Sequence, residues 1–143
     1  MEFQVQLKIR KPVAEVFEAV VNPDKLTGYF LQTSSGPLVR GATVSWKFAE
    51  TPEAFDVVVG EVIANERITF DWPSETGGAT RVEMIFKSLD ADNTMVQIRE
   101  GAWPETPEGA KASHGNAGGW MHMMCCLKGY LEYGINLRAG GAF

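Results

Sequence analysis

The sequence predicts a single α+β domain in which most strands form one antiparallel sheet. Three observations support this: an alternating segment followed by a helical pattern near the N-terminus, a run of alternating segments in the middle, and one long helical stripe near the C-terminus. The chain has 143 residues, and its hydrophobic residues make up 45% of the sequence. This length suits one domain, spanning 1–143, with a core of its own.

The N-terminal part is expected to form one strand and two helices. Residues 3–10 alternate apolar and polar side chains, as in a strand with one buried face. Pro12 favours a helix start, and apolar residues recur at helical spacing over 13–21. Residues 22–23 (Asn-Pro) end this helix, and Asp24 is expected to cap a short second one. The apolar residues of the second helix are Leu26, Tyr29 and Phe30.

The middle of the chain has the pattern of an antiparallel meander. Clusters of turn residues, such as 73–79 and 90–93, separate its alternating segments. The predicted strands are 43–48, 54–63, 67–72, 80–87 and 94–100.

The C-terminal part is expected to be one long amphipathic helix. Residues 101–115 are rich in Gly, Pro and Ala and favour a loop, although a helix starting at Pro107 is an alternative. Residues 116–133 favour a continuous helix, and Gly134 is suited to its C-cap. The apolar stripe of this helix consists of Trp120, Met123, Met124, Leu127, Tyr130 and Leu131.

Composition and charge narrow the classes of function. The net charge is −5 and the only basic cluster is Lys8, Arg10 and Lys11, which argues against a nucleic-acid partner. No apolar run reaches the roughly 18 residues of a membrane span, and the N-terminus lacks a signal-peptide pattern, so we expect a cytoplasmic protein. The adjacent Cys125 and Cys126 are expected to be reduced thiols.

Neither metal binding nor nucleophilic catalysis is favoured. The soft donors in residues 121–126 would point all around a helix, and His114 and His122 are not spaced as a same-face pair. His122 could reach Cys125 or Cys126, but both thiols are expected away from the Trp120 stripe, where little would lower their pKa. We therefore expect no metal and no cofactor.

Glu100 is the one candidate for acid–base chemistry. It follows Val96 and Ile98 on the inward face of its predicted strand, where burial would make a carboxylate a proton donor or acceptor. Arg40 or Arg81 could be its partner. The alternative is that Glu100 is solvated at the strand end.

The order of these elements resembles the activator of heat-shock-protein-90 ATPase homologue-like family, within the START-like (SRPBCC, helix-grip) superfamily. The resemblance extends from residue 3 to about residue 135. It rests on the segments 9–17, 22–26, 29–30, 60–62, 67–72 and 80–82, on Gly41 ahead of the Trp46 strand, and on the helix from Gly119-Trp120 to Tyr130-Leu131-Glu132. It implies a helix-grip fold: a curved antiparallel sheet wrapped around a long C-terminal helix, with two short helices after the first strand and a cavity between sheet and helix.

The resemblance implies that this cavity binds a small hydrophobic or amphipathic ligand, such as a lipid or an aromatic metabolite. The facing positions expected to line it are Trp46, Phe48, Phe70, Trp72, Met84, Phe86, Ile98, Trp120, Met123, Met124 and Leu127. For each of these residues, simple core packing is the alternative. Two other functions remain open: a cyclase-, dehydratase- or hydrolase-like enzyme using Glu100, and a co-chaperone that stimulates a heat-shock-protein-90 ATPase. Both a monomer and a homodimer remain open.

Overall fold

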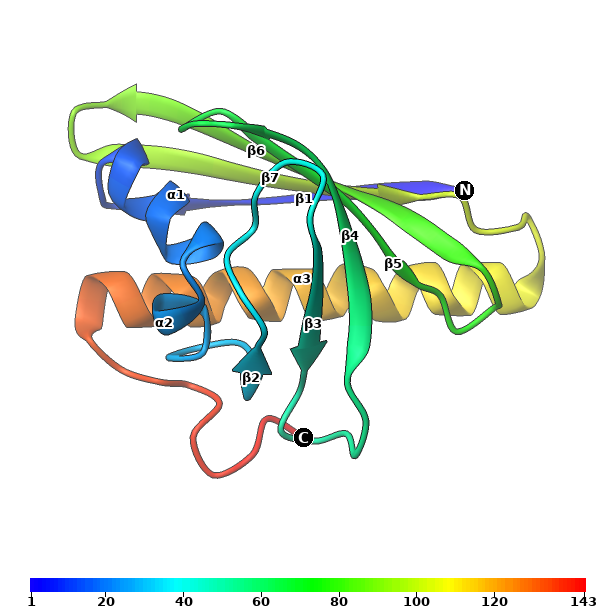
Figure 1. Cartoon of the computed structure of the whole chain (residues 1–143). Helices are drawn as coiled ribbons and strands as arrows, with labels where there is room; N and C mark the ends of the chain where they lie inside the picture. The colour runs from blue at the N-terminus through cyan, green and yellow to red at the C-terminus, as the bar shows by residue number, and fades with distance from the viewer.

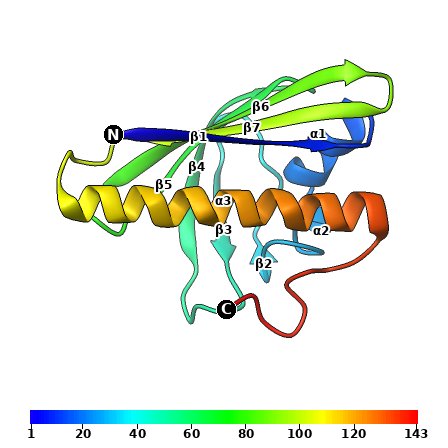
Figure 2. The same cartoon turned by 180° about the vertical axis from the view of Figure 1, so that it is seen from behind.

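The computed structural model describes all residues, 1–143, and has the α+β helix-grip architecture that the sequence predicts. One sheet of seven antiparallel strands curves around a long helix, as Figures 1 and 2 show from opposite sides. The strands are β1 (Glu2–Ile9), β2 (Thr33–Ser34), β3 (Thr43–Lys47), β4 (Phe55–Ile63), β5 (Arg67–Pro73), β6 (Ala79–Asp90) and β7 (Asn93–Gly101). The helices are α1 (Val13–Val21), α2 (Pro23–Leu26) and α3 (Pro107–Tyr133).

The strand order is β1-β7-β6-β5-β4-β3-β2, so β2 to β7 form a meander and β1 is added at its edge beside β7. β1 pairs with β7 along its whole length, with Val5 opposite Ile98. The five strands predicted in the middle of the chain are confirmed, with bounds that shift by up to three residues. The two-residue strand β2 was not predicted, because a segment this short has no measurable alternation.

The two short helices fill one end of the curved sheet. α1 buries Val16, Phe17 and Val20, and the ring of Phe17 meets Phe86 of β6 edge to face, with centroids 5.1 Å apart. The cap of α2 differs from the prediction: the side chain of Asn22, not Asp24, accepts a hydrogen bond from the Asp24 backbone N–H at 3.0 Å. Asn suits an N-cap because its side chain accepts a backbone N–H, and Pro23 suits the first helical position, where no N–H is needed. The helix ends at Leu26, so the prediction that it also carries Tyr29 and Phe30 is wrong: both lie in the turn that follows.

The long helix α3 begins at Pro107, so the prediction of a loop up to residue 115 is wrong and the alternative is correct. Thr106 caps it by accepting a hydrogen bond from the Gly109 N–H at 3.0 Å, and Pro107 follows at the first position. These local signals outweigh the low helix propensity of the glycines that follow. The helix ends at Gly134, whose left-handed backbone (φ 67°) closes the last turn as predicted.

The core lies between the concave face of the sheet and the helices, in one cluster of 26 buried residues. Met123, Met124 and Leu127 of α3 are all at most 1% exposed within it. Cys126 belongs to the same buried cluster as Trp120, so the prediction that both thiols lie away from the Trp120 stripe is wrong for Cys126. The C-terminal half of α3 lies against β1, where Lys128 Nζ donates to the Lys8 carbonyl, and its Tyr130 ring lies 5.3 Å from that of Tyr29, which widens its buried face beyond the Trp120 stripe. Cys125 is exposed.

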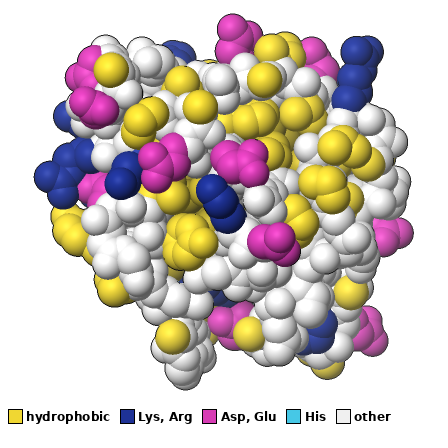
Figure 3. Space-filling view, turned by 60° about the vertical axis from the view of Figure 1, so that its left-hand side comes forward, with side chains coloured by type: hydrophobic (Ala, Val, Ile, Leu, Met, Phe, Trp, Pro, Cys, Tyr) yellow, Lys and Arg dark blue, Asp and Glu magenta, His cyan; other side chains and the backbone are white.

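Acidic, basic and apolar side chains are intermixed on the face of the molecule drawn in Figure 3. Many of the surface charges are paired across neighbouring strands: Arg67, for example, contacts both Glu61 and Glu83. None of the helices is both long and apolar enough to cross a membrane.

Glu132, near the end of α3, joins this helix to the first strand. Its carboxylate is only 3% exposed and accepts hydrogen bonds from the backbone and side chain of Arg10 and from Lys128. Burial alone would raise the pKa of Glu132, but these donors together lower it to about 2.

We predict that Glu132→Gln destabilises the protein above about pH 4.5, and that this difference from the wild type shrinks as the pH falls toward 2. Because the pKa is about 2 in the folded protein and near 4.5 when unfolded, the carboxylate stabilises the fold above pH 4.5 and loses this contribution as the pH falls toward 2. The loss should be about 1–3 kcal/mol in free energy of unfolding. Urea titrations at several pH values measure it. Glu15→Gln, which removes an exposed carboxylate on α1 that lies 3.9 Å from Lys11, is the control and should change little; equal pH profiles for both variants would refute this role of Glu132.

Candidate ligand-binding site

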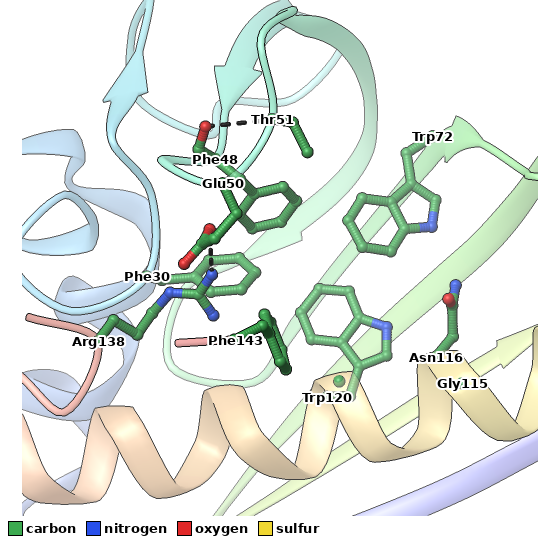
Figure 4. A pocket seen from close by; sticks show the side chains of 11 residues that line it. Phe30, Phe48, Glu50, Thr51, Trp72, Gly115, Asn116, Trp120, Arg138 and Phe143 are labelled. Carbon is green, nitrogen blue, oxygen red and sulfur yellow. Dashed lines mark hydrogen bonds and ion pairs between the residues drawn. The ribbon is translucent and has the colours of Figure 1, made fainter. Parts of the chain in front are cut away.

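A cavity of about 260 Å³ lies between the sheet, the middle of α3 and the C-terminal segment 134–143 (Figure 4). Its walls are mainly aromatic, with a few polar groups. The lining residues are Phe30, Phe48, Glu50, Thr51, Trp72, Gly115, Asn116, Gly119, Trp120, Arg138 and Phe143.

Two tryptophans from opposite sides of the fold form one wall. Trp72 comes from β5 and Trp120 from α3, and their rings stack with centroids 5.0 Å apart and an angle of 30° between planes. Trp46 of β3 stands nearly perpendicular behind Trp72, with centroids 6.4 Å apart, and its buried Nε1 has no hydrogen-bond partner. Phe70 packs against both stacked indoles. The two indoles are therefore held from behind by further rings.

The carboxylate of Glu100 on β7 binds the N–H edges of both indoles. It accepts a hydrogen bond from Trp72 Nε1 at 2.7 Å and one from Trp120 Nε1 at 2.8 Å. The Thr80 hydroxyl donates to the same group, and Asn116 Nδ2 lies 3.1 Å from each oxygen. Glu100 is 1% exposed, so the prediction that it points inward is confirmed and the solvated alternative is wrong.

No cation contacts this buried carboxylate, contrary to the suggestion that Arg40 or Arg81 would pair with it. Arg81 lies on the outer face of the sheet and bonds to Asp71 at 2.7 Å. A carboxylate can accept several hydrogen bonds, and four neutral donors replace the water that Glu100 loses on burial. Glu100 does not itself line the cavity. Its geometry is that of a positioning residue that orients the two indoles.

The opposite wall consists of phenylalanines and an arginine. The rings of Phe30 and Phe48 meet edge to face, with centroids 5.1 Å apart. The guanidinium of Arg138 lies 5.8 Å from the Phe30 centroid, 5.5 Å from that of Phe48 and 5.8 Å from that of Phe143. These separations are in the range of cation–π contacts.

Glu50, on the loop between β3 and β4, holds the C-terminal segment in place. Its carboxylate accepts a hydrogen bond from Arg138 Nη2 at 2.8 Å and one from the Ala142 backbone N–H at 3.3 Å. Burial acts to raise the pKa of Glu50, but hydrogen bonds from backbone N–H groups and from Arg138 outweigh it and leave this pKa below its usual value. The segment therefore lies along the cavity as one of its walls.

Two glycines on one face of α3 leave space in the cavity. Gly115 and Gly119 are one helical turn apart and both line it, and a Cβ added at either would meet no atom within 4 Å. Glycine inside a helix costs about 1 kcal/mol relative to alanine. Because no neighbouring atom requires these glycines, their effect is to keep the helix surface flat beside Trp120.

Three of the predicted lining residues, Phe48, Trp72 and Trp120, line this cavity. The other eight pack in or against the sheet–helix core instead: Trp46, Phe70, Met84, Phe86, Ile98, Met123, Met124 and Leu127. Sequence reasoning did not find Glu50, Asn116 or Arg138. Asn116 is signalled by its position one helical turn before Trp120, whereas nothing in the sequence pattern brings Glu50 and Arg138 together.

The cysteine–histidine pair considered from the sequence does form, but in an unreactive setting. Cys126 Sγ lies 3.6 Å from His122 Nε2, and burial raises the pKa of the thiol, which keeps it protonated. No three His, Cys, Asp or Glu side chains come together in a way that could hold a metal ion.

Residues 10–132 match the family model described as activator of Hsp90 ATPase homolog 1-like protein. The match covers most of the chain, from the end of β1 to the last turn of α3. This protein belongs to the activator of Hsp90 ATPase homolog 1-like family. No functionally curated protein matches the sequence.

Solved structures with the same fold include proteins from several organisms. SSP2350 from Staphylococcus saprophyticus is 29% identical, with a TM-score of 0.84 and 96% of each chain covered. DynU16, a protein in the dynemicin biosynthetic locus, is 28% identical with a TM-score of 0.79; the match covers 93% of this chain but only 48% of DynU16. The Aha1 dimer from Colwellia psychrerythraea is 19% identical, with a TM-score of 0.76 over 94% of this chain and 98% of that one, and shows likeness of fold alone.

We predict that Glu100→Gln destabilises this family member. An amide places an NH₂ group at an oxygen that now accepts from two donors (Oε1) or three (Oε2), so at least one buried donor loses its partner, at a cost of about 1–3 kcal/mol. Urea denaturation measures the free energy, and near-ultraviolet circular dichroism reports the packing of the tryptophans. Glu75→Gln, the same exchange at an exposed loop position, should change stability by less than about 0.5 kcal/mol. Wild-type stability and spectrum in the Glu100 variant would contradict the positioning role.

Proposed function

We propose that this protein binds a small, flat, ring-containing molecule in the cavity between the Trp72–Trp120 pair and the Phe30–Phe48 wall. The observation that carries the proposal is the open space that Gly115 and Gly119 leave beside an oriented pair of indoles. A helix that served packing alone would gain stability from larger residues at both positions. Ligand sites are typically apolar hollows with a few polar groups, which is the composition found here.

The size of the cavity favours a ring compound over a lipid. Its volume of about 260 Å³ is slightly below the range of roughly 300–1,000 Å³ that is usual for ligand pockets. A long acyl chain would have to extend into the core, where Phe70, Met123 and Met124 are already closely packed and at most 1% exposed. A molecule of one or two fused rings fits between the aromatic walls, where stacking on indole is favourable.

Binding is better supported than acid–base catalysis through Glu100. A general acid or base must reach its substrate within hydrogen-bond distance. Glu100 does not line the cavity, and its oxygens are occupied by Trp72, Thr80, Asn116 and Trp120. The presence of the related DynU16 in a biosynthetic locus agrees with a role in handling small molecules.

The test compares two glycines of the same helix. We predict that Gly119→Leu fills the cavity and weakens binding of 2-naphthamide, a neutral two-ring probe, by roughly tenfold or more. Gly118→Leu adds the same side chain at an exposed position that does not line the cavity, so it should bind like the wild type. Isothermal titration calorimetry measures both. Each variant should be at least as stable as the wild type, because leucine has the higher helix propensity.

Nuclear magnetic resonance of the indole N–H groups locates the bound probe. Signals of Trp72 and Trp120 should shift on addition of 2-naphthamide, whereas Trp103, which stacks on Phe3 at 5.6 Å outside the lining, should not. Equal binding by the two leucine variants, or no binding by the wild-type protein, would refute the proposed function.

A further inference from the structure

We infer that the ligand of this cavity is an aromatic acid whose carboxylate binds Arg138 in place of Glu50. The inference rests on the proposed function and adds the chemical class of the ligand. Three features support it: the unused donors of Arg138, the position of Glu50 as a replaceable carboxylate, and the separation of Arg138 from the buried charge of Glu100.

Arg138 is a nearly buried cation with unused hydrogen-bond donors. Its side chain is only 11% exposed, and of the guanidinium nitrogens only Nη2 has a partner in the protein, the Glu50 carboxylate. A guanidinium carries five N–H groups arranged to hold a carboxylate with two parallel hydrogen bonds. The guanidinium lies over the rings of Phe30 and Phe48 at the cavity wall. Arg138 is thus positioned to bind a planar anion that enters the cavity.

Glu50 already shows that a carboxylate is accepted at this place. The side chain of Glu50 is 21% exposed and lies on the loop between β3 and β4, so it can turn outward to water. Glu50 and Arg138 also line a second hollow of about 260 Å³ on the other side of their ion pair, which leaves room for this movement. Exchange of one carboxylate for another keeps the charge of Arg138 compensated, which a neutral ligand that separated the pair would not do.

The arrangement along the cavity sets the orientation of the ligand. Figure 4 shows Arg138 and Asn116 at opposite ends, with Trp120 between them. Asn116 donates to Glu100, so the buried negative charge lies behind the Asn116 end. An anionic group at that end would be repelled, whereas at the Arg138 end it is attracted. The acid therefore binds Arg138 and the rings lie against Trp72 and Trp120.

The test compares 2-naphthoate with its neutral isostere 2-naphthamide in three proteins. Wild-type protein should bind the acid roughly tenfold more tightly, as expected for charge-assisted hydrogen bonds. Glu50→Gln removes the competing carboxylate and should increase this acid-to-amide ratio. Arg138→Gln removes the anion-binding group and should reduce the ratio to about one or below. Calorimetry gives both affinities, and thermal melts show that each variant is folded.

The two variants should change the acid-to-amide affinity ratio in opposite directions, which a purely structural role of the Glu50–Arg138 ion pair would not produce. Either substitution breaks the ion pair that ties the C-terminal segment, so loss of that tie alone would change the ratio in the same direction in both. A common direction, or a wild-type ratio near one, overturns the inference while leaving the proposed function intact if the amide still binds. Failure of both compounds to bind the wild-type protein refutes the proposed function, and the inference with it.

Discussion

The buried carboxylate of Glu100 is the interaction on which the rest of the site depends. Its donors come from three different elements: Trp72 from β5, Thr80 from β6, and Asn116 and Trp120 from α3. One group on β7 therefore sets the position of the helix relative to the sheet at the level of the cavity. Without it, the polar edges of two indoles would be buried without partners, at a cost comparable to several lost hydrogen bonds.

This arrangement favours the cavity at the expense of stability. A buried charge with neutral partners loses much of its hydration energy, and apolar residues of similar size often stabilise a fold more. Gly115 and Gly119 lower the stability of α3 in the turns next to Trp120, which Glu100 binds. Both costs fall beside the same cavity, since Gly115 and Gly119 line it and Glu100 binds two of its lining residues, Trp72 and Trp120. Because Glu100 already orients the indoles, binding of the proposed ligand would cost little conformational entropy in these side chains.

Alternation along strands predicted the α+β class and the inward direction of Glu100. The family resemblance supplied the wrapping of the sheet around the C-terminal helix. The sequence could not separate the few lining residues from the many core residues, since Phe70 and Trp72 share one strand face but only Trp72 reaches the cavity. The contact of Glu50 with Arg138 links residues 88 positions apart through segments without periodic pattern. Such loop contacts depend on the finished fold. The same holds for the burial of Cys126 in the core cluster.

A crystal structure of the protein grown with 2-naphthoate tests most directly whether Glu100 orients a ligand site. We expect density for the rings against Trp72 and Trp120, the carboxylate on Arg138, Glu50 turned outward, and the hydrogen bonds from both indoles to Glu100 unchanged. An empty cavity with the compound bound elsewhere, or indoles that leave Glu100 to make room for it, would contradict this role of Glu100.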